Sequence, residues 1–430
     1  MYRHVRVLAV LMLLSARHGF AYSVETHEQL IDLTWKSAIV PFLLRNYPAT
    51  TAAELERAHA YAYGGCAIQD LGYYPFGNQF FSNLTHYVRS ADFIQYMFLQ
   101  AKDVYELAFA VGALSHYVGD TIGHRDAVNP SVSIEFPKLA KRYGPAATYE
   151  EDPHAHVRTE FAFDVNEISK HRMAPAAYLR HIGLRVPSAL LARAFADTYG
   201  LDFERTVGRR RGIIRTYRFG VRSFLPRIAY AETVLHRKHF PADEQTPAFE
   251  TFLRRLSDAE FEKQWNQYRK KAGIETLLLA WTIVILPKVG PFSLLAIRGP
   301  LPATHGRYID SLNASADLMQ RMLTQAGKRP RTFPNRDLDT GQTVSPGKYR
   351  LTDQTYAKLL DRLTSRPAAS IPPGVKADIQ KYYSDPNAPI STKKNASQWA
   401  EVQHELVVLE GMKTSRETYI TEAADDDADQ

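Results

Sequence analysis

The sequence predicts an all-α protein. Apolar residues recur at intervals of three and four from residue 26 to about residue 235, whereas alternating runs of β-branched residues are scarce. The clearest segments are "THEQLIDLTWKSAIVPFLL", "DVYELAFAVGALSHYVGD", "HVRTEFAFDVNEISKH" and "PSALLARAFADTYG". With 430 residues, of which 45% are apolar and 23% charged, the chain has the composition of a globular protein with a large core.

The first 21 residues have the pattern of an export signal. Two arginines precede an apolar run from Val7 to Leu14, and small residues stand three and one positions before a cut at Tyr22. The run is shorter than the roughly 20 residues that a spanning helix needs, so we favour cleavage over an uncleaved anchor. We therefore expect a secreted or periplasmic chain that begins at Tyr22.

Charge and cysteine content limit the classes of function. The chain has 53 basic and 46 acidic residues, and the signal holds three of the basic ones, so the mature charge is 53 − 3 − 46 = +4. This mild excess is a weak argument for nucleic-acid binding. Cys66 is the single cysteine, which excludes an intrachain disulfide and a thiolate zinc cluster. Any metal site must therefore use His, Asp and Glu.

The rest of the chain divides at about residue 327. The pattern of residues 242–285 predicts one or two further helices. These helices lead into residues 276–297, the most apolar part of the mature chain. Prolines and a glycine interrupt that segment, so we favour a buried helix pair over a membrane-touching surface. Residues 327–430 form a polar, loop-rich extension with a final helix in "SQWAEVQHELVVLEGMK" and an acidic tail. We expect this extension to take no part in the chemistry.

Two polar seams cross otherwise apolar helices. His116, Asp120 and His124 are spaced by four residues and therefore lie on one helix face, and His156 and Glu160 repeat the spacing. Buried titratable groups are costly unless they are paired or bind metal. A mixture of imidazole and carboxylate suits zinc, but each seam alone is also explained by ion pairs that cap a helical core.

Three further candidate ligands lie upstream: His27, Asp70 and His86. His27 is the sixth residue of the expected mature chain. The α-amino group of Tyr22 is therefore close enough in sequence to ligate a metal together with it.

The order of these candidate ligands along the chain resembles that of the zinc-dependent phospholipase C family, which shares its helical fold with the fungal single-strand-specific nucleases. The resemblance covers roughly residues 22–165 and includes nine ligand positions, which are Tyr22, His27, Asp70, His86, His116, Asp120, His124, His156 and Glu160. Tyr22 stands where the bacterial phospholipases and the nucleases have Trp, and His124 follows Asp120 by four residues rather than six. The four-residue spacing is more similar to the glycosylphosphatidylinositol-specific phospholipase D branch.

The resemblance implies up to three zinc ions. Asp70, His86, His116 and Asp120 would hold one ion, and Asp120 would bridge it to a second ion, which His27 and the amino terminus of Tyr22 complete. The third would lie on His124, His156 and Glu160. Asp120 and Asp70 are then the catalytic carboxylates, the first as the bridge and the second as a base or water-orienting group.

These expectations define a function and its alternatives. The first is an exported zinc-dependent phosphodiesterase of the phospholipase C/D type, with a catalytic domain over residues 22–326 and a phospholipid or membrane surface as its partner. The second is a zinc-dependent single-strand nuclease. The third is a non-catalytic, zinc-stabilised, membrane-associated helical protein. No protein partner is implied.

Two segments leave alternatives open. The aromatic loop "LGYYPFGNQFF" either lines a headgroup or base pocket or folds over the core. The basic segment with Arg211, Arg215, Arg218 and Arg222 either meets anionic phosphates or, as we prefer, is a solvated face paired with local acids.

Overall fold

The computed structural model describes residues 24–74, 77–208, 210–236, 241–269, 299–327, 329–365 and 370–415. The predicted signal, Tyr22, the whole apolar segment 276–297 and the acidic tail lie outside these ranges. Within them the protein is all-α, as predicted, and β-pairing is limited to two isolated bridges, Arg336 with Thr343 and Ile371 with Thr414.

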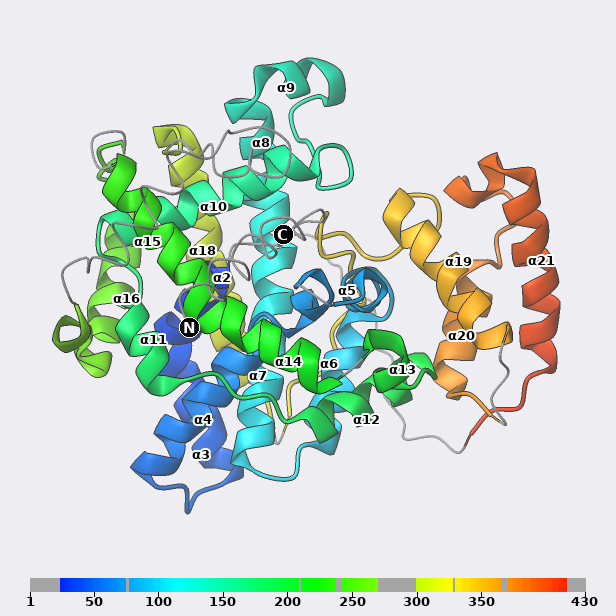
Figure 1. The fold of residues 1–430 in the computed structure, drawn as a ribbon, viewed down its shortest axis with the longest axis horizontal. Helices are drawn as coiled ribbons and strands as arrows, with labels where there is room; N and C mark the ends of the chain where they lie inside the picture. The colour runs from blue at the N-terminus through cyan, green and yellow to red at the C-terminus, as the bar shows by residue number, and fades with distance from the viewer. Residues whose placement is uncertain are drawn as a thin grey trace, which may run out of the picture.

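Helices make up most of the described chain, and the longest described stretch without one lies between α18 and α19 (Figure 1). The N-terminal half contains α2 Val24–Thr34, η1 Trp35–Ile39, α3 Val40–Asn46, α4 Ala52–Gly65, η2 Ile68–Tyr73, α5 Gln79–Tyr87, α6 Ser90–Gln100, α7 Val104–Gly123, η3 His124–Val128, α8 Asn129–Glu135, α9 Pro137–Tyr143, α10 Pro153–Ser169 and α11 Ala176–Ile182. The second half contains α12 Ser188–Tyr199, α13 Phe203–Val207, α14 Arg210–Phe219, η4 Gly220–Phe224, α15 Leu225–His236, α16 Pro247–Lys263, η5 Trp265–Tyr268, α18 Pro302–Thr324, α19 Arg350–Thr364, α20 Pro373–Tyr382, η7 Ser391–Lys394 and α21 Ala396–Gly411. Of these helices, none has the length and the apolar character that crossing a bilayer requires.

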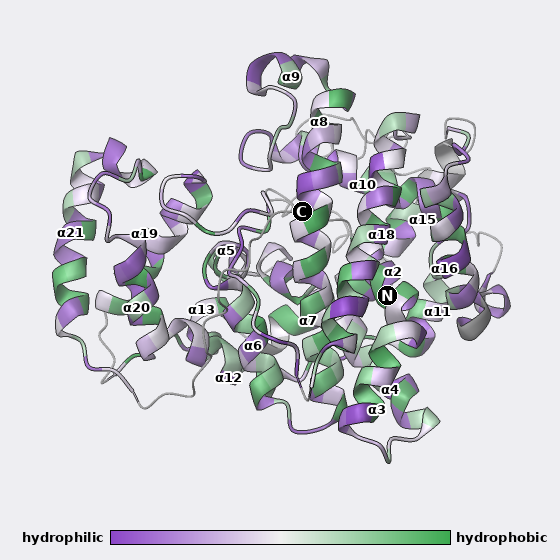
Figure 2. Cartoon of the chain, turned by 180° about the vertical axis from the view of Figure 1, so that it is seen from behind, coloured by the Kyte–Doolittle hydropathy of each residue, from purple (hydrophilic) through white to green (hydrophobic). Residues whose placement is uncertain are grey.

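Helix α7 is the central element of the fold, and other helices surround it (Figure 1). It begins where the Asp103 carboxylate accepts hydrogen bonds from the amides of Tyr105 and Glu106, an N-cap of the usual kind. Every residue of α7 except these two is buried. Figure 2 shows hydrophobic residues along α7 and its neighbours, while α9 is mainly hydrophilic. The helix therefore carries its polar seam through the apolar core.

Glycines allow α4 and α7 to pack unusually closely. A Cβ atom at Gly112 would stand 2.2 Å from the carbonyl oxygen of Ala62, and one at Gly65 would stand 2.1 Å from that of Phe109. Only glycine permits backbones to approach to this distance. The close contact fixes η2, which follows α4, beside the polar seam of α7.

The polar segment after residue 327 is tied to the ligand-bearing helices. The Asn335 side-chain oxygen accepts hydrogen bonds from the amides of Ala91 and Asp92 at the start of α6. The Leu338 amide donates to the His86 carbonyl at 3.1 Å. Helices α19–α21 then form a separate layer, in which α19 packs on α5 (Figure 1).

Candidate metal centre

Eight of the nine candidate ligands lie in the described part of the chain, and the structure brings all eight together from six elements, α2, η2, α5, α7, η3 and α10. They form three groups, which are His27, His116 and Asp120; Asp70, His86 and His116; and His124, His156 and Glu160. Within each group the potential ligand atoms lie within 4.8 Å of one another. Every one of these side chains is at most 2% exposed. The ninth candidate, Tyr22, lies outside the described residues.

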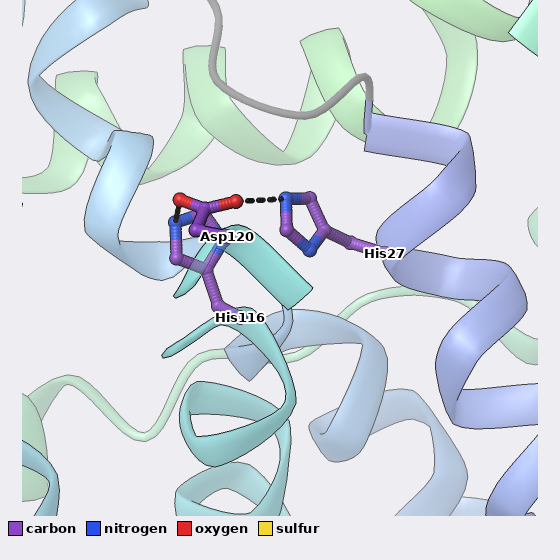
Figure 3. Close-up of side chains that lie close together, drawn as sticks. All are labelled: His27, His116 and Asp120. Atoms are coloured by element: carbon purple, nitrogen blue, oxygen red, sulfur yellow. Dashed lines mark ion pairs between the residues drawn. The ribbon is translucent and has the colours of Figure 1, made fainter. Parts of the chain in front are cut away.

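Asp120 is located between the groups. Its Oδ1 atom lies 3.2 Å from His27 Nε2 and its Oδ2 atom lies 3.0 Å from His116 Nε2. Figure 3 marks both ion pairs with dashed lines. Oδ2 is also 3.5 Å from His86 Nε2, and Oδ1 is 3.9 Å from His124 Nε2. One carboxylate therefore faces imidazoles of all three groups, which is the placement that a bridging ligand needs.

His116 belongs to both of the first two groups, a feature that the sequence did not predict. Its ring stacks on that of His27, with centroids 4.3 Å apart, and its Nε2 atom lies 3.4 Å from His86 Nε2. Asp70 completes this cluster from η2, because its Oδ1 atom is 3.3 Å from His86 Nε2.

The third group is formed where α7 meets α10. Glu160 Oε1 lies 3.1 Å from His124 Nε2 and 3.0 Å from His156 Nε2. His156 and Glu160 are one turn apart on α10, as the sequence spacing predicts. His124 begins a π-helical turn at the end of α7 rather than continuing the α-helix, and such turns are frequent at functional sites.

Backbone carbonyls orient three of the imidazoles. The Nδ1 atoms of His116, His86 and His124 lie 3.0, 2.8 and 2.8 Å from the carbonyl oxygens of Cys66, Ser82 and Leu338, respectively. A carbonyl can only accept, so each Nδ1 carries the proton and donates it. The lone pair of each Nε2 then points into the cluster, which is the tautomer that a metal ligand requires.

Sequence reasoning missed the contribution of Leu338. This residue stands 214 positions after His124, in the polar extension that we expected to take no part in the chemistry. The interaction uses a main-chain carbonyl, so no residue type in the sequence could indicate it.

Asp164, one further turn along α10, does not join the metal groups. Its Oδ1 atom accepts a hydrogen bond from the Thr26 hydroxyl at 2.5 Å, and its Oδ2 atom accepts one from the Glu25 amide at 3.2 Å. Asp164 therefore holds the start of α2, the helix from which His27 reaches the cluster.

Electrostatics show that the groups compete for protons. Although burial opposes it, the neighbouring His116 and His124 imidazoles hold the pKa of Asp120 well below its ordinary value. Burial raises the pKa of Glu160 to about 8 and lowers that of His156 to about 4. A divalent cation would displace the protons that the cluster shares, because metal ligands bind in their deprotonated forms.

The donor atoms fit a bound metal. Both carboxylate oxygens of Asp70 and of Asp120, one oxygen of Glu160 and both ring nitrogens of His156 are buried without a regular hydrogen bond among the described residues, and the close contacts described above join ligands of the cluster to one another. Buried polar atoms are rarely left unsatisfied in proteins. Mixed imidazole and carboxylate donors, with no thiolate, are a ligand set that zinc accepts.

A second buried imidazole–carboxylate pair lies outside the three groups. His59 Nε2 is 3.1 Å from Asp32 Oδ1, and the Tyr63 hydroxyl donates to Asp32 Oδ2 at 2.8 Å. On the other side of the ring, Lys263 Nζ lies 3.3 Å from His59 Nδ1. His59 Nε2 and Asp32 Oδ1 are likewise buried without a regular hydrogen bond among the described residues, but the pair lies outside the three metal groups and serves as a comparison for them.

The aromatic loop belongs to the core where it is described. Tyr73, Tyr74, Phe80 and Phe81 are all at most 8% exposed, which agrees with a loop folded over the core. Phe76 lies outside the described residues. Cys66 is a buried free thiol, and burial raises its pKa well above its ordinary value.

Comparison with known proteins gives one match. Residues 26–205 match the family model of zinc dependent phospholipase C, and no curated protein or solved structure matches the chain. The matched region begins just before His27 and contains all eight described candidate ligands. Residues 26–205, which carry the three groups, are therefore similar to the zinc-dependent phospholipase C family.

Proposed function

We propose that this protein is an exported zinc-dependent phosphodiesterase that hydrolyses the phosphodiester bonds of phospholipids. The observation that carries the proposal is the convergence of three buried His and carboxylate groups on Asp120, within a region that matches the phospholipase C family. A site that only stabilised the fold would need one closed set of four ligands, whereas this cluster provides three sets.

The residues have distinct roles in this proposal. Zinc ions, when bound, neutralise phosphate oxygens and lower the pKa of water. Asp120 and His116 hold the first two ligand sets at a fixed separation, and His124, His156 and Glu160 provide the set that receives the substrate phosphate. Asp70 accepts the proton of the attacking water at a carboxylate oxygen. The water oxygen bonds to phosphorus while a P–O ester bond breaks, and the leaving oxygen takes up a proton.

The spacing of His116, Asp120 and His124 supports a finer proposal. A spacing of four residues from Asp120 to His124 is the pattern that resembles the glycosylphosphatidylinositol-specific phospholipase D branch. A glycosylated phosphatidylinositol is therefore included among the substrates to be tested, and the released product shows which side of the phosphate is cut.

A single preparation tests the proposal. The chain is expressed with its signal, its mature N-terminus is sequenced and its zinc is counted by mass spectrometry. Hydrolysis of phosphatidylcholine, phosphatidylinositol, a glycosylphosphatidylinositol and single-stranded DNA is then compared. We expect a start at Tyr22, bound zinc and phospholipid cleavage. Hydrolysis of DNA alone would support the nuclease alternative, and absence of zinc would refute both enzymatic functions.

A further inference from the structure

Five arginines gather on a surface formed by α11, the residues after it, α14, η4 and α15. We call this surface the arginine face, and it consists of Arg180, Arg185, Arg218, Arg222 and Arg227. Helix α11 packs on η4, and η4 joins α14 to α15 (Figure 1). Arg180 lies close enough to Arg222 and Arg227, and Arg218 to Arg222 and Arg185, for their charges to interact. Four of the five side chains are exposed, and Arg222 is half-buried at the centre.

The arginine face has no acidic partners among the described residues. The fold pairs arginines elsewhere, as Arg89 with Asp92 at 2.7 Å and Arg350 with Glu150 at 2.5 Å, but no described carboxylate forms an ion pair with any of the five. At its edge, Glu56 lies 3.5 Å from His181 Nε2 instead. The expectation that Arg218 and Arg222 are paired with local acids is therefore wrong for this part of the chain.

The five guanidinium groups repel one another. Burial and then Arg227 and Arg222 lower the pKa of Arg180, while burial and then Arg222 and Arg185 lower that of Arg218. In addition, the Nε atom of Arg222 is buried without a hydrogen-bond partner. Like charges held together destabilise a fold, and an anionic partner would remove both the repulsion and the missing hydrogen bond.

The helices that carry this surface directly cover the candidate metal centre. Tyr217 of α14 packs edge-on against Tyr74, which follows η2 and Asp70, with ring centroids 5.2 Å apart. A Cβ atom at Gly220 would stand 2.6 Å from the same Tyr74 ring. Helix α15 packs on α10, which carries His156 and Glu160. An anionic surface bound to the arginine face would therefore lie against the elements that hold the ligands.

We propose that the arginine face docks the protein on membranes that contain anionic phospholipid. This inference rests on the proposed function, since a phospholipid substrate is presented at such a surface. Half-buried Tyr61 adjoins Arg218 and stacks on Tyr105 at 5.3 Å, and aromatic and cationic side chains placed together are typical of proteins at the membrane interface. Arginines beside an anionic leaflet attract it by short-range electrostatics.

Flotation with vesicles tests the docking surface. Zinc-loaded wild type, the double variant Arg180→Gln/Arg218→Gln and a control, Arg321→Gln/Arg362→Gln, are mixed with vesicles of phosphatidylcholine alone or with one part phosphatidylserine to three parts phosphatidylcholine. Each control residue is an exposed helical arginine outside the arginine face, so both variants lose the same charge. Each arginine near an anionic leaflet contributes about fivefold to partitioning, so we expect the double variant to bind phosphatidylserine vesicles about 25-fold more weakly.

The control is expected to partition as wild type does, and added salt should weaken wild-type binding. Equal losses in the two variants, or equal wild-type binding to both kinds of vesicle, would overturn the proposal. So would tighter wild-type binding to a fluorescent single-stranded oligonucleotide than to phosphatidylserine vesicles. Hydrolysis of a short-chain, monomeric phospholipid is measured in parallel and should be the same in all three proteins. Its absence in wild type would refute the proposed function, while the flotation result would still decide whether the arginine face binds membranes.

Discussion

Asp120→Asn is the most direct perturbation of the candidate metal centre. The substitution keeps the size of the side chain and one oxygen, but it removes the negative charge and the second oxygen. In the structure those oxygens lie 3.2 Å from His27 Nε2 and 3.0 Å from His116 Nε2. A zinc ion held by either imidazole would therefore be in contact with the carboxylate.

The size of the effect follows from this geometry. Two unit charges about 4 Å apart interact by about 4 kcal/mol at an effective dielectric constant of about 20. The double charge of zinc increases the attraction, and the cost of burying the carboxylate offsets part of it. A net loss of about 4 kcal/mol corresponds to an affinity about 1,000-fold weaker. We expect Asp120→Asn to lose both zinc and hydrolytic activity.

The assay is zinc content after dialysis against increasing concentrations of a chelator, measured on wild type, Asp120→Asn and Asp32→Asn. Asp32 is an equally buried aspartate beside an imidazole, and it lies outside the metal groups. Asp32→Asn should retain zinc even if it lowers the free energy of unfolding. Full zinc retention by Asp120→Asn, or the same loss in both variants, would refute the bridging role.

Three further predictions follow from other parts of the structure. Glu160→Gln should lower the zinc content by one ion per chain, because Glu160 belongs to the third group alone, where it contacts His124 and His156. Loss of all zinc would show that the three groups do not bind metal independently. Gly112→Ala should lower the free energy of unfolding by more than about 3 kcal/mol in urea melts, because its Cβ would stand 2.2 Å from the Ala62 carbonyl oxygen. The control Gly212→Ala has open space around it and should instead raise the free energy of unfolding by about 1 kcal/mol. Burial, and then Lys263, lowers the pKa of His59 from 6.5 to about 4, so the unfolded chain takes up a proton before the folded one. The neutral His59 side chain therefore makes its full contribution to the free energy of unfolding above pH 6.5, and this contribution falls by about 3 kcal/mol as the pH decreases to 4. Urea melts of wild type and His59→Gln over this pH range should show a steeper pH dependence in wild type.

The sequence by itself determined the fold class and which candidate ligands lie one helical turn apart. Helical periodicity is a local property, so it placed His116, Asp120 and His124 on one face of α7 and put His156 one turn from Glu160. All eight candidate ligands that the structure describes lie within residues 26–205, the region that the family model matches. Asp164, one further turn along α10, has the same helical spacing but holds the start of α2 instead of joining the metal groups.

Only the tertiary structure decided how the seams meet. The sharing of His116 between two groups depends on the stacking of His27 from α2, and the orientation of His124 depends on the Leu338 carbonyl from a segment that we had set apart from the chemistry. The absence of acidic partners at the arginine face depends in the same way on which described helices pack beside α14 and η4. These relations join residues that are tens to hundreds of positions apart and often use main-chain atoms. Spacing along the sequence cannot encode them, because they arise only when the packed core brings those segments together.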